Sequence, residues 1–417
     1  MTLSHVVILN DASRARGGAT GLAVLSALRL RERGLRVSYV CGDSGDAADL
    51  AEAGVEVIAA GSGRLLERGR LQAMRSGIYD AEMRDFVAAA VARTDGPGTV
   101  FHLHGWAQIF SPAVFAALAP VAQKTFIHAH DMFLACPNGV YMDYRRNQVC
   151  LRRPLSAACI MTHCDKRSYG HKLWRVARQR ALFRAFDPGL GWAGVLPIHP
   201  GMLPRLQRAG YGEALFKVVR NPAVPFVPAR VQAEKNGYLV YVGRLEEDKG
   251  ALDLARAVKR TGAELVFVGD GVLRERLVRD FPQIKVTGWL SKPEMTDWIS
   301  GARALVMPSH HPEPFALVLA EATGCGLPVA VAKTALMAEE IEAAGMGLAF
   351  DVFDQDDFDA TLRAFMDMDR PGLREMSVRG YRGPVRLAQE EQAWISQLIS
   401  LYQGALGESP TIRAVTA

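Results

Sequence analysis

The sequence predicts an α/β protein with two doubly wound, parallel-sheet domains. Short apolar runs typical of buried strands alternate with helical stretches along nearly all of the 417 residues. The alternation is interrupted between residues 221 and 236, where Pro222, Pro225 and Pro228 precede a polar stretch. A chain of this length can build two domains, each with its own core.

The first domain is expected to span residues 1–221. Its strands are predicted at residues 6–9, 37–40, 55–58, 99–103, 124–127 and 190–196, separated mostly by helical stretches such as residues 19–33. Parallel sheets of this kind bind ligands beyond the carboxyl ends of their strands.

The second domain is expected to span residues 222–387, and a helix near residues 388–401 with a tail to residue 417 follows it. Its strands are predicted at residues 238–242, 264–268, 284–286, 303–307, 329–331 and 348–350. Because ligands bind at the carboxyl ends in both sheets, the two domains are expected to face a common cleft.

Residues 311–321 carry two glutamates, Glu313 and Glu321, eight positions apart. Residues 304–307 before them read as a short buried strand, and Pro314 suits the first position of a helix. A helix is therefore predicted to begin near Glu313. Its free N–H groups and the positive end of its dipole would point at a bound anion.

This spacing suits a nucleoside diphosphate sugar. Eight helical steps span about 12 Å at most, comparable to the separation of a hexose from a ribose across a diphosphate. One carboxylate could accept hydrogen bonds from the sugar and the other from the ribose. The alternative is that Glu313 complements the helix dipole and Glu321 is a solvated residue.

Two cations follow the apolar run 238–242, which ends in a turn at Gly243. Arg244 can hold a phosphate with a fork of donors, and Lys249 supplies a point charge.

The E-x7-E pair and the G-R-L-x-x-x-K-G loop together resemble the C-terminal half of the family 4 retaining glycosyltransferases, which have the GT-B fold. The resemblance implies transfer of a sugar from a nucleoside diphosphate sugar to a hydroxyl acceptor, with retention. It implies that Glu313 positions the donor hexose and Glu321 the ribose, while Arg244 and Lys249 stabilise the diphosphate. Further donor contacts are implied at Gly243, Gly269, Gly271, Phe315, Ala316 and Leu317. Ala316 stands where the family usually has glycine.

The first domain is implied to bind the acceptor, a glycan or a lipid-linked molecule. Gly17 and Gly18 resemble the family's loop between donor phosphate and acceptor. His104 and His130 lie at the carboxyl ends of predicted strands, where the family holds the transferring sugar or the β-phosphate. A lone histidine is usually structural, but two at corresponding strand ends favour a catalytic role. The final helix, by the same resemblance, crosses back to the first domain.

Composition favours a soluble globular protein, with 49% hydrophobic and 22% charged residues. No apolar run approaches the roughly 18 residues of a membrane helix, and no signal peptide is recognisable at the N-terminus. A cytoplasmic protein is therefore expected.

Charge is distributed unevenly along the chain. Residues 1–220 carry 28 Lys and Arg against 17 Asp and Glu, a net of +11, which leaves −6 for residues 221–417. The basic segment 145–184 suggests peripheral binding to an anionic membrane at its inner face, close to a lipid-linked acceptor. The alternative is a solvated helix face. Nucleic acid is not expected as a partner, because no binding motif accompanies the charge.

Four cysteines, Cys136, Cys150, Cys159 and Cys164, lie within 29 residues. A zinc-stapled loop is conceivable, although the spacings match no standard finger, and a cytosolic location disfavours disulfides. The D-x-D sequences at residues 354–356 and 367–369 read as solvated helix faces. No catalytic metal and no cofactor are therefore predicted.

Two other function classes stay open. A non-catalytic nucleotide-sugar binding or regulatory protein would keep the same fold. A Rossmann oxidoreductase is less favoured, because the chain lacks G-x-G-x-x-G after the first strand.

Overall fold

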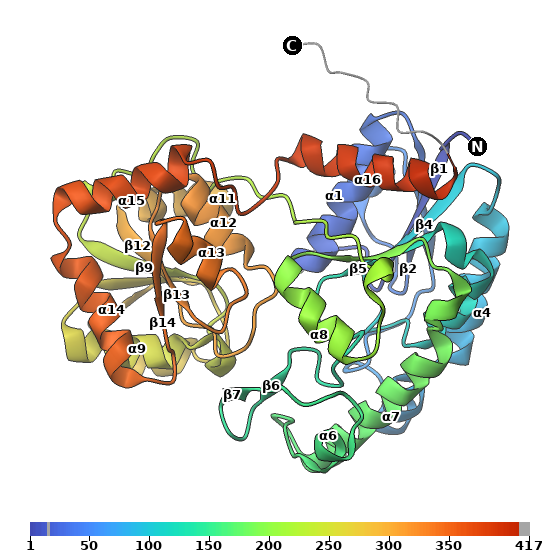
Figure 1. The fold of residues 1–417 in the computed structure, drawn as a ribbon, viewed down its shortest axis with the longest axis horizontal. Helices are drawn as coiled ribbons and strands as arrows, with labels where there is room; N and C mark the ends of the chain where they lie inside the picture. Colours follow the sequence, from blue (N-terminus) through green and yellow to red (C-terminus); the bar gives the residue numbers. More distant parts are fainter. Residues whose placement is uncertain (15–16, 408–417) are drawn as a thin grey trace. The chain divides into compact units, whose positions relative to one another are not determined.

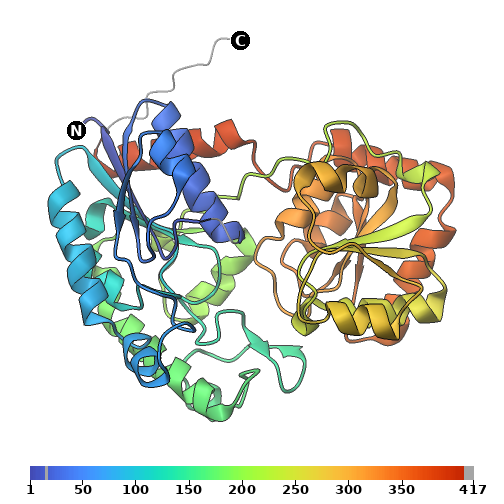
Figure 2. The same cartoon turned by 180° about the vertical axis from the view of Figure 1, so that it is seen from behind.

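The computed structural model describes residues 1–14 and 17–407, which form two compact units. Of the described residues, those within Met1–Val140 and Leu151–Arg220 form the first unit together with residues 392–407, and Tyr141–Cys150 and Asn221–Glu391 form the second. Each unit is built around one six-stranded sheet. Figures 1 and 2 show these sheets from opposite sides.

The sheet of the first unit has the strand order β3-β2-β1-β4-β5-β8, and all its pairs are parallel. The strands are β1 (His5–Asn10), β2 (Arg36–Cys41), β3 (Glu56–Ala59), β4 (Thr99–Leu103), β5 (Thr125–Ala129) and β8 (Gly194–Pro197). The chain winds in opposite directions on either side of β1 and β4, so the carboxyl ends of these two strands are the expected place for a ligand.

The final helix packs on the first unit, as expected. Helices α1 (Gly18–Glu32) and α16 (Glu391–Ala405) lie on the same face of the sheet (Figure 2). Trp394 and Tyr402 of α16 are fully buried in the core that also contains Leu30 of α1. Burial of large side chains of this kind is the main stabilising contribution to such a contact.

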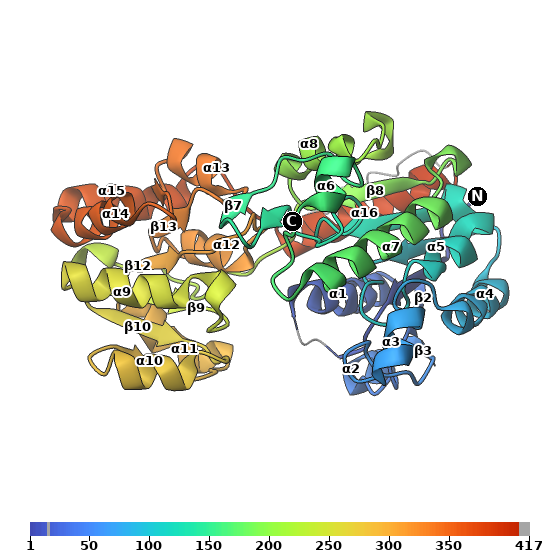
Figure 3. The same ribbon diagram turned by 90° about the horizontal axis from the view of Figure 1, so that it is seen from below.

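The other helices of the first unit are α2 (Ala48–Glu52), α3 (Arg70–Ser76), α4 (Ala81–Thr94), α5 (Ala113–Leu118), α6 (Ala157–Met161), α7 (Tyr169–Ala185) and α8 (Leu203–Arg208). Helix α5 packs against both α4 and α7, as Figure 3 shows from below. A short antiparallel pair, β6 (Met142–Asp143) and β7 (Gln148–Val149), lies in the segment that clusters with the second unit.

The second unit repeats the design with the strand order β11-β10-β9-β12-β13-β14, again all parallel. Its strands are β9 (Tyr238–Val242), β10 (Leu265–Val268), β11 (Lys285–Val286), β12 (Ala302–Met307), β13 (Val329–Ala332) and β14 (Gly347–Phe350). The winding direction changes between β9 and β12, which marks the corresponding ligand position.

The helices of the second unit are α9 (Ala251–Thr261), α10 (Arg274–Asp280), α11 (Lys292–Ser300), α12 (Leu317–Gly324), α13 (Ala338–Ala343), α14 (Gln355–Asp367) and α15 (Arg370–Arg382). Figure 1 shows α9 and α14 on one side of the strands and α11, α12 and α13 on the other. Within the described residues, no helix is both long and apolar enough to cross a membrane.

The predicted fold class is confirmed, and all twelve predicted strands are present. The strand expected at residues 190–196 begins only at Gly194, because Pro188–Leu190 forms a 3₁₀ turn that the Asp187 side chain caps. The helix expected to begin near Glu313 begins at Leu317 instead, so Glu313 lies in the loop before α12.

Candidate active site

Glu313 is the centre of a charged cluster beyond the carboxyl ends of β9 and β12. Its Oε1 atom pairs with Lys249 Nζ and accepts a hydrogen bond from Ser309 Oγ at 3.0 Å. His311 Nε2 lies 3.3 Å from the same oxygen. The side chains of Glu313 and Lys249 are only 17% and 21% exposed.

The surroundings of Glu313 keep it ionised. Burial alone would raise the pKa of this carboxyl, but the charge of Lys249, the nearby His311 and the hydrogen bonds from Lys249 and Ser309 outweigh burial and lower it. Burial lowers the pKa of His311, which favours the neutral ring. A carboxylate in this state can accept hydrogen bonds from sugar hydroxyls.

Close backbone packing brings Lys249 to Glu313. Gly250 ends the turn that carries Lys249, and its φ of +73° is favourable for glycine. A Cβ atom at Gly250 would lie 1.9 Å from the carbonyl oxygen of Pro308, so only glycine allows the turn to approach the loop after β12.

Backbone hydrogen bonds also fix the loop before α12. The N–H of Leu336 donates to the carbonyl of Glu313 at 3.0 Å, and Thr334 Oγ1 donates to the carbonyl of Ser309 at 2.6 Å. Ala316 is the N-cap residue of α12 with φ −86° and ψ 101°, a conformation that needs no glycine. The extended backbone at Ala316 is the physical reason that the helix starts four residues later than expected.

Of the four charged side chains predicted to bind the donor, only two are in direct contact with each other. Lys249 and Glu313 are in contact, whereas the side chain of Arg244 is 69% exposed and pairs with Glu246 at 2.7 Å. Glu321 lies on α12 and pairs with Lys292 Nζ at 3.0 Å. Sequence reasoning missed Lys292, because a lysine 29 positions away carries no local signal.

The glycines that were predicted to contact the donor nucleotide pack against the protein's own loops. A Cβ at Gly269 would lie 1.9 Å from the carbonyl oxygen of Gly243, and one at Gly271 would lie 2.6 Å from that of Leu245. The N–H of Leu245 donates to the carbonyl of Asp270 at 2.9 Å. The close approach that these glycines permit is therefore to the protein's own backbone.

The first unit contains a cavity of 390 Å³ at the carboxyl ends of β1, β4 and β5. His104 and His130 both line it, and His104 Nδ1 lies 3.1 Å from His130 Nε2. Ala19 and Thr20, which directly follow Gly17 and Gly18, line it as well. Residue 16, which precedes the two glycines, lies outside the described residues.

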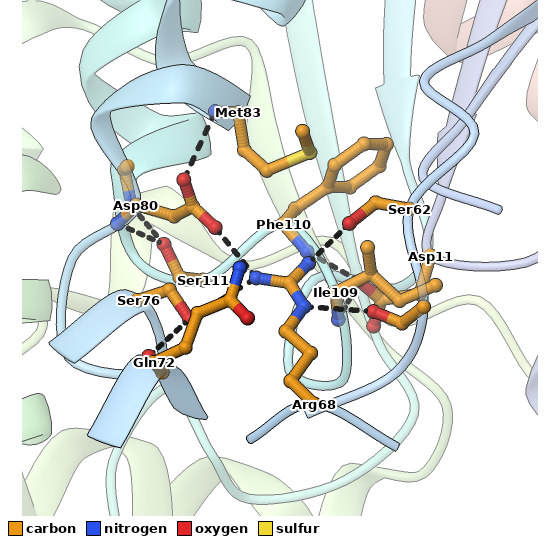
Figure 4. A network of polar contacts seen from close by, with 12 residues as sticks. Asp11, Ser62, Arg68, Gln72, Ser76, Asp80, Met83, Ile109, Phe110 and Ser111 are labelled. Atoms are coloured by element: carbon orange, nitrogen blue, oxygen red, sulfur yellow. Dashed lines mark hydrogen bonds and ion pairs between the residues drawn. The ribbon is translucent and has the colours of Figure 1, made fainter. Parts of the chain in front are cut away.

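Two carboxyl groups of the cavity were missed by sequence reasoning. Asp11, directly after β1, accepts backbone hydrogen bonds from Gln108, Ile109 and Phe110 at 2.7, 2.8 and 2.9 Å; Figure 4 shows it beside Ile109 and Phe110. Burial raises the pKa of Asp131 to about 6 and lowers that of His130 to about 3. Asp11 follows β1 directly and Asp131 lies two positions after β5, and these positions could have identified both acids.

Aromatic rings form another part of the cavity wall. The Arg178 guanidinium lies over the rings of Trp106 and Trp174, 5.4 and 5.7 Å from their centres. It also donates to the carbonyl of Ala107 at 2.8 Å. Indole rings beside carboxyl groups are suited to a carbohydrate, which presents apolar C–H faces and hydroxyls together.

A buried ion pair fixes the segment next to this cavity. Arg68 donates to Asp80 at 2.8 Å, to Ser76 at 3.0 Å and to Ser62 at 2.7 Å (Figure 4). Both charged side chains are 7% exposed, and Asp80 also caps α4. The loop that carries Leu65 is thereby held against α3 and α4.

The basic segment 145–184 is only partly a surface feature. Lys172 is 1% exposed and donates to Cys159 Sγ at 3.4 Å, and Arg178 is 9% exposed.

Asp354 and Asp369 are helix-capping residues, because the side chain of Asp354 accepts backbone N–H groups at the start of α14 and that of Asp369 accepts one at the start of α15. This is consistent with the interpretation of the D-x-D at residues 354–356 as part of a helix surface.

A family model supports the interpretation of the second unit. Residues 227–382 match the family described as "Glycosyl transferases group 1". The matched segment includes Lys249 and Glu313, together with the loops that hold them.

Curated relatives are similar over part of their length. The chain is 30% identical to a glycogen synthase of Mycobacterium tuberculosis over 173 residues, 38% of this chain and 41% of that protein. It is 26% identical to a GDP-mannose-dependent alpha-mannosyltransferase of Mycolicibacterium smegmatis, over 49% of this chain and 53% of that protein. The matches thus span about half the length of these relatives.

Solved structures share the fold along nearly the whole chain. Sucrose-phosphate synthase from Thermosynechococcus elongatus superposes with a TM-score of 0.70 at 16% identity, over 97% of this chain and 100% of that one. HepE from Anabaena, solved in complex with UDP, gives a TM-score of 0.64 at 16% identity, over 96% and 100%. At this level of identity, the likeness shows the two-domain GT-B fold.

Proposed function

We propose that this protein is a glycosyltransferase that moves a sugar from a nucleoside diphosphate sugar to a hydroxyl acceptor, with retention and without a catalytic metal. The observation that carries the proposal is the partly buried, ionised Glu313 paired with Lys249, within the segment that matches the group 1 glycosyl transferases. The family 4 resemblance of the two motifs supports retention.

The donor would be held by groups of the second unit. Glu313 would accept hydrogen bonds from the hexose and Glu321 from the ribose. Lys249 and Arg244 would neutralise the charge that develops on the departing diphosphate, assisted by the backbone N–H groups near Phe315. Lys249 already lies at Glu313, whereas Arg244 would have to leave Glu246, and the chemistry would be electrostatic stabilisation of the leaving group.

The acceptor would bind in the cavity of the first unit. His104, His130 and Asp131 offer polar contacts there, and Trp106 offers an apolar face. With its pKa raised to about 6, Asp131 lies near the range in which a carboxyl group can accept a proton at neutral pH. A glycan or a lipid-linked sugar fits this combination of aromatic and carboxyl groups.

We further propose that the protein is cytoplasmic and binds peripherally to the inner face of an anionic membrane. Leu66, Leu71 and Met74 are 80%, 77% and 56% exposed, close in sequence to the exposed cations Arg70 and Arg75. Exposed apolar side chains next to cations are typical of interfacial binding. The same segment lines a 480 Å³ groove that also includes Arg167.

Turnover tests the proposed activity directly. The purified chain would be incubated with UDP, GDP and ADP sugars, with and without a mixture of glycan and lipid-linked acceptors and with a chelator present. We expect acceptor-dependent release of one nucleoside diphosphate, and NMR of the product should show the anomeric configuration of the donor. Donor binding without turnover would favour a non-catalytic protein, and nicotinamide-cofactor binding would favour an oxidoreductase.

A further inference from the structure

Four histidines form a ladder on one face of the first unit's sheet. His102 and His104 are two positions apart at the end of β4, as are His128 and His130 at the end of β5, so each pair points to the same face. The ring centres of His102 and His104 are 4.1 Å apart, and those of His104 and His128 are 4.9 Å apart. This face is the one that α16 covers.

Hydrogen bonds satisfy only some of the ring nitrogens in this ladder. His102 Nδ1 lies 2.6 Å from the Tyr402 hydroxyl, and His102 Nε2 lies 3.2 Å from His128 Nδ1. His104 Nδ1 bonds to His130 Nε2. His102, His104 and His128 are 0%, 4% and 2% exposed.

Two ring nitrogens of the ladder have no protein partner. His104 Nε2 and His128 Nε2 are fully buried and make no hydrogen bond. A neutral imidazole has one donor and one acceptor nitrogen, and leaving either one unpaired in the interior is costly. A bound cation that takes the lone pair of His104 Nε2 would remove this cost at His104.

We propose that His102, His104 and His128 form a binding site for a divalent transition metal, best suited to zinc. One ring nitrogen of each lies within 4.8 Å of the others. Nitrogens at about 2.0–2.1 Å from a tetrahedral zinc ion are about 3.3 Å apart, and His102 Nε2 and His128 Nδ1 already lie 3.2 Å apart. Three imidazoles with one open position make a common zinc environment.

The surroundings suit such a site. His102, His104 and His128 are all buried, so water competes little for their ring nitrogens. Tyr402 contacts the second ring nitrogen of His102 and would orient that ring, as outer partners of metal-bound histidines do. His104 and His128 line the 390 Å³ cavity, so an ion could enter from there.

This metal would act on the acceptor side of the molecule. It would fix His104, which in turn contacts His130 in the cavity. This role rests on the proposed function, whereas metal binding itself does not, because the proposed donor site lies in the second unit and binding can be measured without sugar transfer.

Cobalt titration of the whole chain tests the site. After treatment with a chelator, the protein would be titrated with Co²⁺ and followed by visible absorption, and Zn²⁺ would then compete. We expect one equivalent bound with the absorption of tetrahedral cobalt and no thiolate charge-transfer band. Absence of saturable binding by folded protein would overturn the proposal. So would a thiolate band that disappears in Cys159→Ser, which would place the metal at the cysteines.

Variants locate the ligands. His128→Gln should abolish stoichiometric binding, whereas the same change at the exposed His171 should not alter it. Tyr402→Phe should weaken binding by about 10–100-fold, as loss of an outer partner does. Unchanged affinity in folded His128→Gln would contradict the assignment. If circular dichroism shows that His128→Gln does not fold, unchanged metal affinity in Tyr402→Phe would contradict the assignment instead.

Discussion

Glu313 owes its ionised state to three side chains around one oxygen atom. Burial opposes the charge, and the contacts from Lys249, His311 and Ser309 restore it. A carboxylate held by its neighbours needs little rearrangement when a ligand replaces water, which is the basis of electrostatic preorganisation. The same contacts make the charge of Glu313 dependent on Lys249.

Replacing Lys249 by methionine should reverse the effect of Glu313 on acid stability. In the wild type the folded-state pKa of Glu313 is below its unfolded value of about 4.3, so its contribution to stability is present above that pH and is lost as pH falls through the folded-state pKa. In Lys249→Met, burial would raise this pKa, so that contribution should increase as pH falls.

Melting temperatures measured from about pH 7 to about pH 4 check this sign. Lys235→Met, at an exposed lysine, serves as the control and should follow the wild type. Parallel pH profiles for Lys249→Met and the wild type would mean that Lys249 does not set the charge of Glu313.

The two cations of the proposed donor site, Lys249 and Arg244, should both affect binding of the diphosphate. Lys249→Ala and Arg244→Ala should each weaken binding of the nucleoside diphosphate by about 1.5–3 kcal/mol, because each removes a charge-assisted contact. Arg244 must leave Glu246 to do so, which its 69% exposure permits. Calorimetry with the bare nucleoside diphosphate measures both losses, and wild-type affinity in both variants would refute this assignment.

At the scale of elements, the turn before α9 sets the position of Lys249. Gly250 precedes this helix and Gly262 follows it, with φ of +73° and +74°. Only Gly250 is crowded, because a Cβ there would meet the Pro308 carbonyl, whereas nothing lies within 4 Å of a Cβ at Gly262. A substitution at Gly262 therefore tests the backbone conformation alone, whereas one at Gly250 tests the conformation together with the packing against Pro308.

Alanine at each of these glycines measures that difference. Gly262→Ala should cost about 1–2 kcal/mol, the penalty of a left-handed backbone for a residue with a Cβ. Gly250→Ala should cost more, about 3 kcal/mol, and should also lower donor affinity because Lys249 moves. Denaturant unfolding measures both losses of unfolding free energy. Equal losses would show that the close contact with Pro308 adds nothing to the cost of alanine at Gly250.

The strands could be predicted from the sequence, because burial requires apolar residues at their positions. Parallel strands covered on both faces, such as β9, are apolar throughout, so a run of consecutive apolar residues identifies them. The start of α12 was not predictable, because the Leu336 N–H bond to Glu313 comes from a distant loop and keeps residues before Leu317 out of the helix. Pro314 alone indicated the wrong position.

For the whole molecule, the candidate site was predictable in part. His104 and His130 were expected at corresponding strand ends and are in contact, because neighbouring parallel strands end at the same edge. The contact of Lys292 with Glu321 could not be foreseen, because the two residues are 29 positions apart. The pairing of Arg244 with Glu246 could not be foreseen either, because the sequence does not indicate which rotamer an exposed arginine adopts.

The proposed membrane association concerns the whole chain and has its own test. Sedimentation with anionic vesicles should exceed that with neutral vesicles and should fall as salt is raised. Leu71→Ala should weaken the binding, because Leu71 is 77% exposed next to cations, whereas Val272→Ala, at a residue 85% exposed in the second unit, should not. Equal sedimentation with both vesicle types would leave the basic segment as a solvated surface.

The measurement closest to the central claim compares the two glutamates in parallel assays. Calorimetry would follow the bare nucleoside diphosphate, and steady-state kinetics would follow the full sugar donor. Glu321→Gln should weaken both ligands, because both contain the ribose. Glu313→Gln should leave binding of the bare diphosphate nearly unchanged and lower kcat/KM for the donor by about 100-fold or more, because its contact is to the transferred sugar. If Glu313→Gln weakened the bare diphosphate as much as Glu321→Gln does, the proposed role of Glu313 at the transferred sugar would be contradicted.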